Sequence, residues 1–176
     1  MCIRDSSNVA STYTKYLKNN IGVVTCNKIA CSDNYENYIK LKNLSKKYNT
    51  PFLFETNVGA GLPIIDTLNH LIASGDKIQK IQAILSGSLN FIFNNYNTTR
   101  SFRDVVYDAM DKGYTEPDPT IDLSGVDVSR KILILARECG HKVELEDVVN
   151  YKFLSDDCLN SINNDDLFKN LLNNEK

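Results

Sequence analysis

The segment Gly113–Lys131 gathers the residues of this chain that are best suited to chemistry. It places four carboxylates, on Glu116, Asp118, Asp122 and Asp127, ahead of the lysine that ends it. Its two prolines fix φ and restrict the residues before them, so the first two acids are expected on extended backbone. Fixed carboxylates beside one amine suit a small polar substrate that carries a positive charge.

A helix is expected over Leu123–Cys139, with Ser124 as its N-cap. Asp127 then lies where an acidic residue favours the helix start, and Lys131, four residues later, shares its face. Further charged residues fall on or beside that face, namely Arg130, Arg137 and Glu138. By periodicity alone this is an ordinary solvated face with one ion pair.

Several runs of this sequence together resemble the homoserine dehydrogenase family. Gly113–Lys131 is similar to the family's Gly-Tyr-Thr-Glu-Pro-Asp-Pro segment and to the Asp-Leu-Ser/Asn-Gly-x-Asp-Val-x-Arg-Lys segment after it, with Thr120 and Ile121 as the looser positions. Three further runs resemble family segments in the same order, and they are Val23–Lys28, Phe54–Pro63 and Ile84–Ile92. The resemblance covers most of the chain.

The resemblance implies a role for five residues. Lys131 is expected to give and take the proton of the reacting oxygen, with Lys28 as the second catalytic lysine, between cofactor and substrate. Glu116 is expected to bind the amino group of the substrate, and Asp122 and Asp127 are expected to contact the substrate as well. Reduction of an aldehyde leaves a developing alkoxide, which must gain a proton from a nearby acid. For Lys28 the alternative is a surface lysine after a strand, and for Glu116 it is an exposed turn acid.

The resemblance also implies NADP or NAD as the cofactor, contacted by Asn27, Lys28 and Gly113. Asn27 and Lys28 follow an expected strand, and the carboxyl ends of parallel strands are where such sheets bind cofactors. A second lysine usually follows in the family, whereas Ile29 stands here. The glycine fingerprint that holds a pyrophosphate does not occur in this sequence.

A monovalent cation, sodium or potassium, is implied at the turn after the second expected strand. The family encircles it with backbone carbonyls at the positions of Glu55, Val58, Ala60 and Leu62. Oxygen ligands suit hard cations whatever the side chain. The alternative is simply a tight strand-to-helix turn.

Periodicity predicts an α/β fold. A right-handed parallel βαβ unit is expected from Ile21–Thr25, Asp33–Tyr48 and Pro51–Thr56, after a first helix at Val9–Asn19. A strand is then expected at Lys77–Leu85, among four helices: Leu62–Ser74, Leu89–Tyr96 with a possible cap at Ser88, Ser101–Met110 capped by Ser101, and Leu123–Cys139.

Two parts are expected along the chain. From the resemblance, residues 1–56 are interpreted as the end of a Rossmann-like NAD(P)-binding domain that lacks its first half. Residues 57–176 are interpreted as an α+β catalytic and dimerisation domain, with helices on one sheet face, that lacks its C-terminal end. The opening Met-Cys-Ile-Arg-Asp-Ser joins abruptly to the first helix and is interpreted as foreign to it.

Composition excludes several classes of protein. A net charge of −2 without a basic stripe argues against a nucleic-acid partner. No apolar run reaches the roughly 18 residues of a membrane span. The five cysteines are scattered without a Cys-x-x-Cys pair, so a cytoplasmic protein with reduced thiols is expected, with neither a disulfide framework nor a zinc site. His70 and His141 have no partner spacing and are interpreted as bystanders.

The expected function is NAD(P)-dependent interconversion of L-homoserine and L-aspartate 4-semialdehyde, on the route to threonine and methionine, by a homodimer or larger oligomer. The first alternative is an inactive truncated subunit that acts only as a dimerisation or interaction module. A less favoured one is another amino acid or sugar dehydrogenase of similar architecture. Because the glycine fingerprint is missing, the isolated chain is expected to be inactive.

Overall fold

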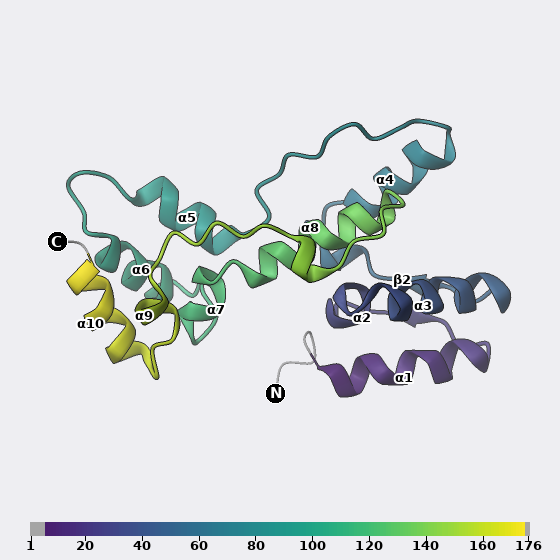
Figure 1. The fold of residues 1–176 in the computed structure, drawn as a ribbon, viewed down its shortest axis with the longest axis horizontal. Helices are drawn as coiled ribbons and strands as arrows, with labels where there is room; N and C mark the ends of the chain where they lie inside the picture. Colours follow the sequence, from purple (N-terminus) through teal and green to yellow (C-terminus); the bar gives the residue numbers. More distant parts are fainter. Residues whose placement is uncertain (1–5, 175–176) are drawn as a thin grey trace. The chain divides into compact units, whose positions relative to one another are not determined.

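The computed structural model describes residues 6–174. Apart from Ser6, the opening stretch interpreted as foreign lies outside the described residues. The chain forms short strands and many helices, coloured along the sequence in Figure 1. In order, the elements are α1 Ser7–Lys18, β1 Val23–Val24, α2 Ile29–Ser32, α3 Tyr35–Lys47, β2 Phe52–Leu53, η2 Glu55–Asn57, α4 Ile64–Ala73, α5 Gly87–Asn95, α6 Phe102–Asp111, α7 Pro119–Leu123, α8 Val126–Glu138, η3 Leu145–Asp147, α9 Asp156–Leu159 and α10 Asn164–Asn174.

The described residues divide into two compact units. The first unit comprises residues 6–82 and 130–149, and the second comprises residues 83–129 and 150–174. The division falls inside α8, so Asp127 belongs to the second unit and Lys131 to the first. The expected division into a nucleotide-binding part and a catalytic part at residue 56 stays a prediction.

In the first unit, the predicted parallel pairing of two strands is confirmed. Val23 pairs with Phe52 and Val24 with Leu53, and α3 lies between the strands in sequence. Val23 and Phe52 are buried, whereas Val24 and Leu53 are 81% and 54% exposed. Both strands are shorter than predicted, and the 3-10 helix η2 begins at Glu55, inside the range predicted for the second strand.

The first unit is held together by α1, α3 and the strand pair. Tyr13 of α1 packs against Phe52, with 6.1 Å between ring centroids, and its hydroxyl is 2.7 Å from Thr25 Oγ1. Leu17 of α1 and Tyr38 of α3 are buried in the same unit. Both helices therefore bury apolar side chains in this unit, whereas Tyr16 of α1 is 42% exposed.

The strand predicted at Lys77–Leu85 is wrong. These residues are neither helix nor strand, and Ile84 is 79% exposed. A strand requires a neighbour for its backbone hydrogen bonds, and within residues 6–174 the β1–β2 pair is the sheet that forms. The imperfect alternation of apolar residues in this segment does not substitute for a pairing partner.

The second unit is helical. α5, α6, α7, α9 and α10 surround one core, and α9 and α10 lie near α6 (Figure 1). The predicted cap at Ser101 is confirmed, since its hydroxyl accepts from Asp104 N at 3.0 Å. The cap expected at Ser88 is wrong, because Ser86 Oγ accepts from Leu89 N at 3.1 Å and α5 begins at Gly87, two residues before the predicted start at Leu89.

The helix predicted over Leu123–Cys139 is found as α8, but it begins three residues later, and Leu123 is the last residue of a separate short helix, α7. Asp118 caps α7 with Pro119 as its first residue, and α7 ends at Leu123 with Ser124 as its C-cap. Gly125 then takes φ +71°, a left-handed conformation that interrupts the helix, and α8 begins at Val126. Gly125, rather than the predicted Ser124, directly precedes α8, while the Ser124 hydroxyl accepts from Val126 N at the start of that helix, at 3.4 Å.

Of the helices in the part of the chain that the structure describes, none has the length and apolar character needed to cross a bilayer.

Candidate active site

The loop that carries Glu116 is fixed by a carboxylate six residues away. Glu116 N donates to Asp122 Oδ2 at 2.8 Å, while the Ser88 hydroxyl donates to Asp122 Oδ1 at 2.7 Å. Asp122 thus joins the Glu116 loop to the first turn of α5. The Glu116 side chain is exposed, and its carboxylate makes no hydrogen bond or ion pair with residues 6–174. The loop presents an acid while holding its backbone in place.

The start of this loop is set by Gly113 and Tyr114. Gly113 follows α6 with φ +72°, and its N–H donates to Met110 O at 3.0 Å. Tyr114 stacks on Phe91 of α5 with 4.5 Å between ring centroids. A left-handed residue after a helix is a common helix stop, so the local role of Gly113 is explained by the turn. Its expected contact with the cofactor stays a prediction.

Asn27 and Lys28 lie between β1 and α2. Asn27 is 1% exposed, with Nδ2 donating to Ser6 O at 2.8 Å and Oδ1 accepting from Ile29 N at 2.9 Å. Asn27 therefore shapes the chain where β1 passes into α2. Lys28 is the N-cap of α2 and is 8% exposed, so the alternative of an ordinary surface lysine is wrong.

Helix α8 carries Asp127 and Lys131 one turn apart, and both side chains are partly buried. The expectation of a fully solvated charged face is wrong toward the end of the helix. Arg137 is 2% exposed and Glu138 is 8% exposed. Glu138 accepts from the Tyr38 hydroxyl at 2.5 Å and pairs with Lys42 Nζ at 2.9 Å, so these charges are compensated.

A cleft in the first unit is lined by residues that adjoin the two expected catalytic lysines, Lys28 and Lys131, in the sequence. It is lined by the residue after Lys28 and the residue before Lys131, together with the start of α3 and η3. The lining residues are Ile29, Ser32, Asp33, Asn34, Arg130, Glu144, Leu145 and Glu146. The chain therefore brings the neighbours of the two lysines to one surface of this unit.

The turn expected to hold a cation has a specific backbone shape. Gly59 and Ala60 take φ +80° and +53°, whereas Gly61 has no positive φ. A Cβ on Gly59 would lie 2.5 Å from Ile64 Cγ1, so the turn excludes a side chain there. The Glu55 carboxylate accepts from Ile65 N at 2.7 Å and Asp66 N at 2.8 Å, which caps α4.

The carbonyls of this turn are partly used within it. Val58 N donates to Glu55 O at 3.3 Å, and Ile64 N donates to Leu62 O at 2.9 Å. A carbonyl oxygen has two lone pairs, so each retains one for a ligand. Across residues 6–174 no group of three or more His, Cys, Asp or Glu side chains could hold a metal ion. A cation at this turn would therefore depend on main-chain oxygens.

Sequence reasoning missed the cluster around Arg137. The signal was the helical period, since Arg137 follows the buried Leu133 by four residues and Ile134 by three. This spacing puts Arg137 on the apolar side of α8, where a charged group needs partners. The short helix α2, which supplies two of those partners, was also missed because four residues carry no periodicity.

The fold and the site define a class of protein. The parallel strands with a crossover helix are of α/β type, and solved structures of nicotinamide-dependent oxidoreductases share the fold. A homoserine dehydrogenase from a hyperthermophilic archaeon, solved with NADPH, is 31% identical with a TM-score of 0.71, over 79% of this chain and 43% of that one. A Candida auris protein of unknown function is 34% identical with a TM-score of 0.88, over 96% of this chain and 49% of that one.

Sequence comparison names the family. The family model described as homoserine dehydrogenase matches residues 63–172. The chain is 51% identical over 147 residues to the chloroplastic bifunctional aspartokinase/homoserine dehydrogenase 2 of Zea mays, covering 84% of this chain and 16% of that protein. It is 46% identical over 144 residues to homoserine dehydrogenase of Schizosaccharomyces pombe, covering 79% of this chain and 38% of that protein. The chain belongs to the homoserine dehydrogenase family, and it spans well under half the length of these curated relatives.

Proposed function

We propose that this chain supplies the substrate-binding and acid–base part of an enzyme that interconverts L-homoserine and L-aspartate 4-semialdehyde, in threonine and methionine biosynthesis. The observation that carries the proposal is the Glu116 loop. Its backbone is held by Asp122 at 2.8 Å while its carboxylate stays exposed. An exposed carboxylate on a backbone held in this way suits the ammonium group of an amino acid substrate.

Lys131 is assigned the proton transfer. When the aldehyde is reduced, an acid near the carbonyl oxygen must neutralise the developing negative charge. A lysine ammonium supplies both the proton and a positive charge, and Asp127 lies one turn earlier on α8. In the oxidation of homoserine, the same amine takes the proton from the hydroxyl. Asp122 and Asp127 are assigned to the substrate as well.

The cofactor is assigned to the carboxyl end of β1. Asn27 and Lys28 lie three and four residues after Val24, the last residue of β1, on the side where open parallel sheets bind ligands, and Lys28 is buried. The amide of Asn27 is occupied within the chain, so Lys28 would make the closer contact, and Gly113 is assigned to the cofactor as well. A bound NADP or NAD supplies or accepts the hydride.

The proposal has three further parts. The turn Glu55–Leu62 binds a monovalent cation, the protein assembles into a homodimer or larger oligomer, and it is located in the cytoplasm. The left-handed residues Gly59 and Ala60 and the remaining carbonyl lone pairs support the cation. The maize relative is named as chloroplastic, so location depends on the organism.

A second candidate is an inactive subunit that acts only through association. The exposed apolar side chains on the strand pair, Val24 and Leu53, favour it, because such a face stabilises a protein when a partner covers it. Homoserine-dependent reduction of NADP by a full-length protein that carries this segment decides between the two. Turnover that is lost in Lys131→Met supports the enzyme, whereas a protein that associates without turnover supports the second candidate.

A further inference from the structure

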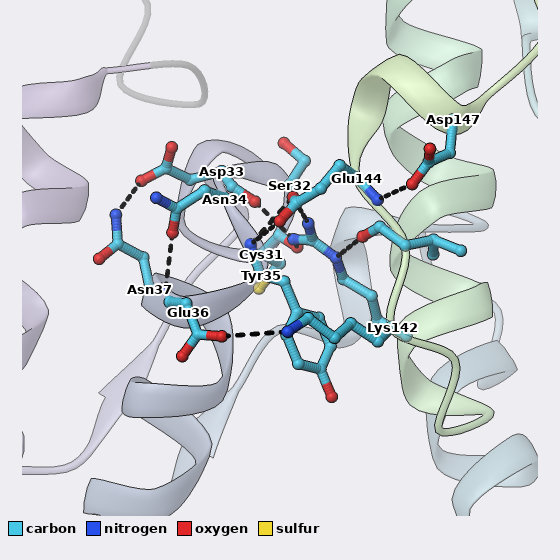
Figure 2. Close-up of polar contacts among 12 residues, drawn as sticks. Cys31, Ser32, Asp33, Asn34, Tyr35, Glu36, Asn37, Lys142, Glu144 and Asp147 are labelled. Carbon is cyan, nitrogen blue, oxygen red and sulfur yellow. Dashed lines mark hydrogen bonds and ion pairs between the residues drawn. The ribbon is translucent and has the colours of Figure 1, made fainter.

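Arg137, in the last turn of α8, is surrounded by hydrogen-bond acceptors. Each of its three side-chain nitrogens donates: Nε to Val143 O at 3.0 Å, and Nη2 to Glu144 Oε2 at 2.8 Å. Nη1 donates to Cys31 O at 2.8 Å and to Asp33 O at 2.6 Å. Figure 2 shows this cluster, with the α2–α3 segment on one side and Glu144 and Asp147 on the other. The guanidinium is therefore fixed in position from several directions.

The two acceptors on Nη1 belong to the end of α2. Cys31 lies in its last turn and Asp33 is its C-cap. A cation bound to the last carbonyls of a helix satisfies their hydrogen-bonding capacity and complements the helix dipole. Because α2 has four residues and begins after Lys28, Arg137 holds the far end of the short helix whose near end is Lys28.

Glu144 extends the same attachment to α3. Its carboxylate oxygens both lie 3.0 Å from Tyr35 N, at the start of α3, while one of them also accepts from Arg137. Glu144 N in turn donates to Asp147 Oδ2 at 2.8 Å, which fixes the turn that carries it. Removing only one partner of a buried ion pair destabilises a protein, because the other charge is left uncompensated.

The residue after Arg137 makes a parallel attachment. Glu138 binds Tyr38 and Lys42, both on α3. Burial and the Glu138 carboxylate raise the pKa values of Tyr38 and of the Cys31 thiol, so both groups stay neutral. The last turn of α8 is thus joined to α2 by Arg137 and to α3 by Glu138. Of the two, Arg137 reaches the segment that begins at Lys28.

We propose that Arg137 is a positioning residue for the reaction, which fixes the spacing between Lys131 and Lys28. This inference rests on the proposed function, since it takes those two lysines as the catalytic pair. Lys131 precedes Arg137 by six residues on the same helix, about 9 Å along its axis. If the end of α2 is released from α8, the two amines shift relative to each other. A misplacement of about 1 Å costs on the order of 10²-fold in rate.

The test uses a full-length enzyme that carries this segment, with Arg137→Lys as the main variant. A lysine keeps the charge, but one ammonium cannot reproduce the fork that spans Val143, Glu144 and the two α2 carbonyls. We expect kcat per folded molecule to fall about 10- to 100-fold, with KM values for homoserine and NADP within about 2-fold of the parent. The dependence of kcat on pH is expected to change as well.

The matched control is Lys142→Ala. Lys142 pairs with Glu36 at 3.4 Å, so it joins the same two segments, but both side chains are at least 70% exposed. An exposed pair contributes little, so kcat and its pH profile should match the parent. Folded protein is measured in each case by thermal unfolding, so that a loss of stability is separated from a loss of turnover.

Three outcomes decide the inference. Parental kcat and pH profile in folded Arg137→Lys overturn it, whatever the change in melting temperature. Should Arg137→Lys not fold, Glu144→Gln replaces it, because the amide oxygen still accepts from Nη2; a kcat lower by about 3-fold or more supports the inference and parental kcat overturns it. A parent that does not oxidise homoserine refutes the proposed function, whereas an active parent with an equally active variant refutes the positioning role alone.

Discussion

The Ser88 hydroxyl donates to the Asp122 carboxylate at 2.7 Å, and the other oxygen of that carboxylate holds the backbone of Glu116. Two residues distant in sequence therefore fix the loop on which the proposed ammonium-binding acid stands. Ser88 is buried, so the bond is shielded from water. The arrangement orders Glu116 before a substrate arrives, which lowers the entropy cost of binding.

Glu116→Gln is expected to weaken homoserine binding by about 1.5–3 kcal/mol, the scale of a hydrogen bond to a charged group, or roughly 10- to 100-fold in the dissociation constant. Cofactor affinity should stay unchanged. Titration of homoserine into a full-length enzyme measures the effect. Glu36→Gln, at an exposed position of α3, is the control. Equal affinities in Glu116→Gln and the parent would remove Glu116 from the substrate site.

Lys131→Met is expected to reduce turnover by about 10²- to 10⁴-fold, the range of general acid–base catalysis. Methionine keeps much of the side-chain volume but carries no proton to transfer. Steady-state kinetics and a direct measurement of NADP affinity separate the chemical step from binding. Lys152→Met, at an exposed lysine that pairs with Asp156, should behave as the parent. Near-normal turnover in Lys131→Met would return this residue to a purely structural role.

The turn Glu55–Leu62 is expected to bind a monovalent cation through main-chain oxygens. A crystal grown with a heavier alkali ion should show anomalous scattering within the turn. Gly59→Ala should abolish that signal, because its Cβ would meet Ile64 Cγ1 at 2.5 Å and force the backbone to move. Gly75→Ala changes another left-handed glycine, where a Cβ meets nothing within 4 Å, and should keep the ion. Carbonyls that point outward in a high-resolution map would end this proposal.

The chain as given is expected to bind neither NADPH nor NADH tightly. The glycine fingerprint supplies the backbone amides that hold a pyrophosphate at a helix N-terminus, and it does not occur in this sequence. Lys28 contributes one charge, which cannot replace those amides. Nicotinamide fluorescence during titration of the purified chain provides the measurement. Micromolar binding, or oxidation of homoserine by the chain alone, would contradict the expectation.

Cys26 and Cys31 are expected to differ in their rates of alkylation. Cys26 is exposed, whereas Cys31 is fully buried and its pKa is raised by burial and by Glu138. At about pH 8, iodoacetamide should therefore modify Cys26 rapidly and Cys31 only after unfolding, because the thiolate is the reactive form. Mass spectrometry of peptides against time and denaturant gives both rates. Rapid modification of Cys31 in the folded protein would show that α2 opens readily from α3 and α8.

The sequence predicted those features of the fold that depend on neighbouring residues. The parallel pairing of Val23 with Phe52 and the cap at Ser101 follow from apolar runs and from one hydroxyl at the right offset. The break at Gly125 was missed because the apolar period continues through it, while the backbone does not. The strand predicted at Lys77–Leu85 failed because pairing depends on a partner that the segment itself cannot supply.

The candidate site was predictable to a different extent. The run that holds Glu116 and Lys131 was found through its resemblance to a family, which carries information on roles that spacing alone lacks. That Asp122 holds the Glu116 backbone could not be read from the sequence, since the bond depends on the turn between them. Arg137 looked like part of a charged surface, and its burial follows from α2, an element too short to predict.

Three of the acceptors on Arg137, the oxygens of Cys31, Asp33 and Val143, belong to the main chain. A carbonyl oxygen is the same whichever side chain its residue bears. Mutation can therefore change the side chains at these three positions over evolutionary time without removing an acceptor from Arg137. The arginine itself has no such latitude, because no other side chain offers its planar fork of donors. The attachment of α8 to α2 through Arg137 therefore depends on the identity of one side chain, that of Arg137.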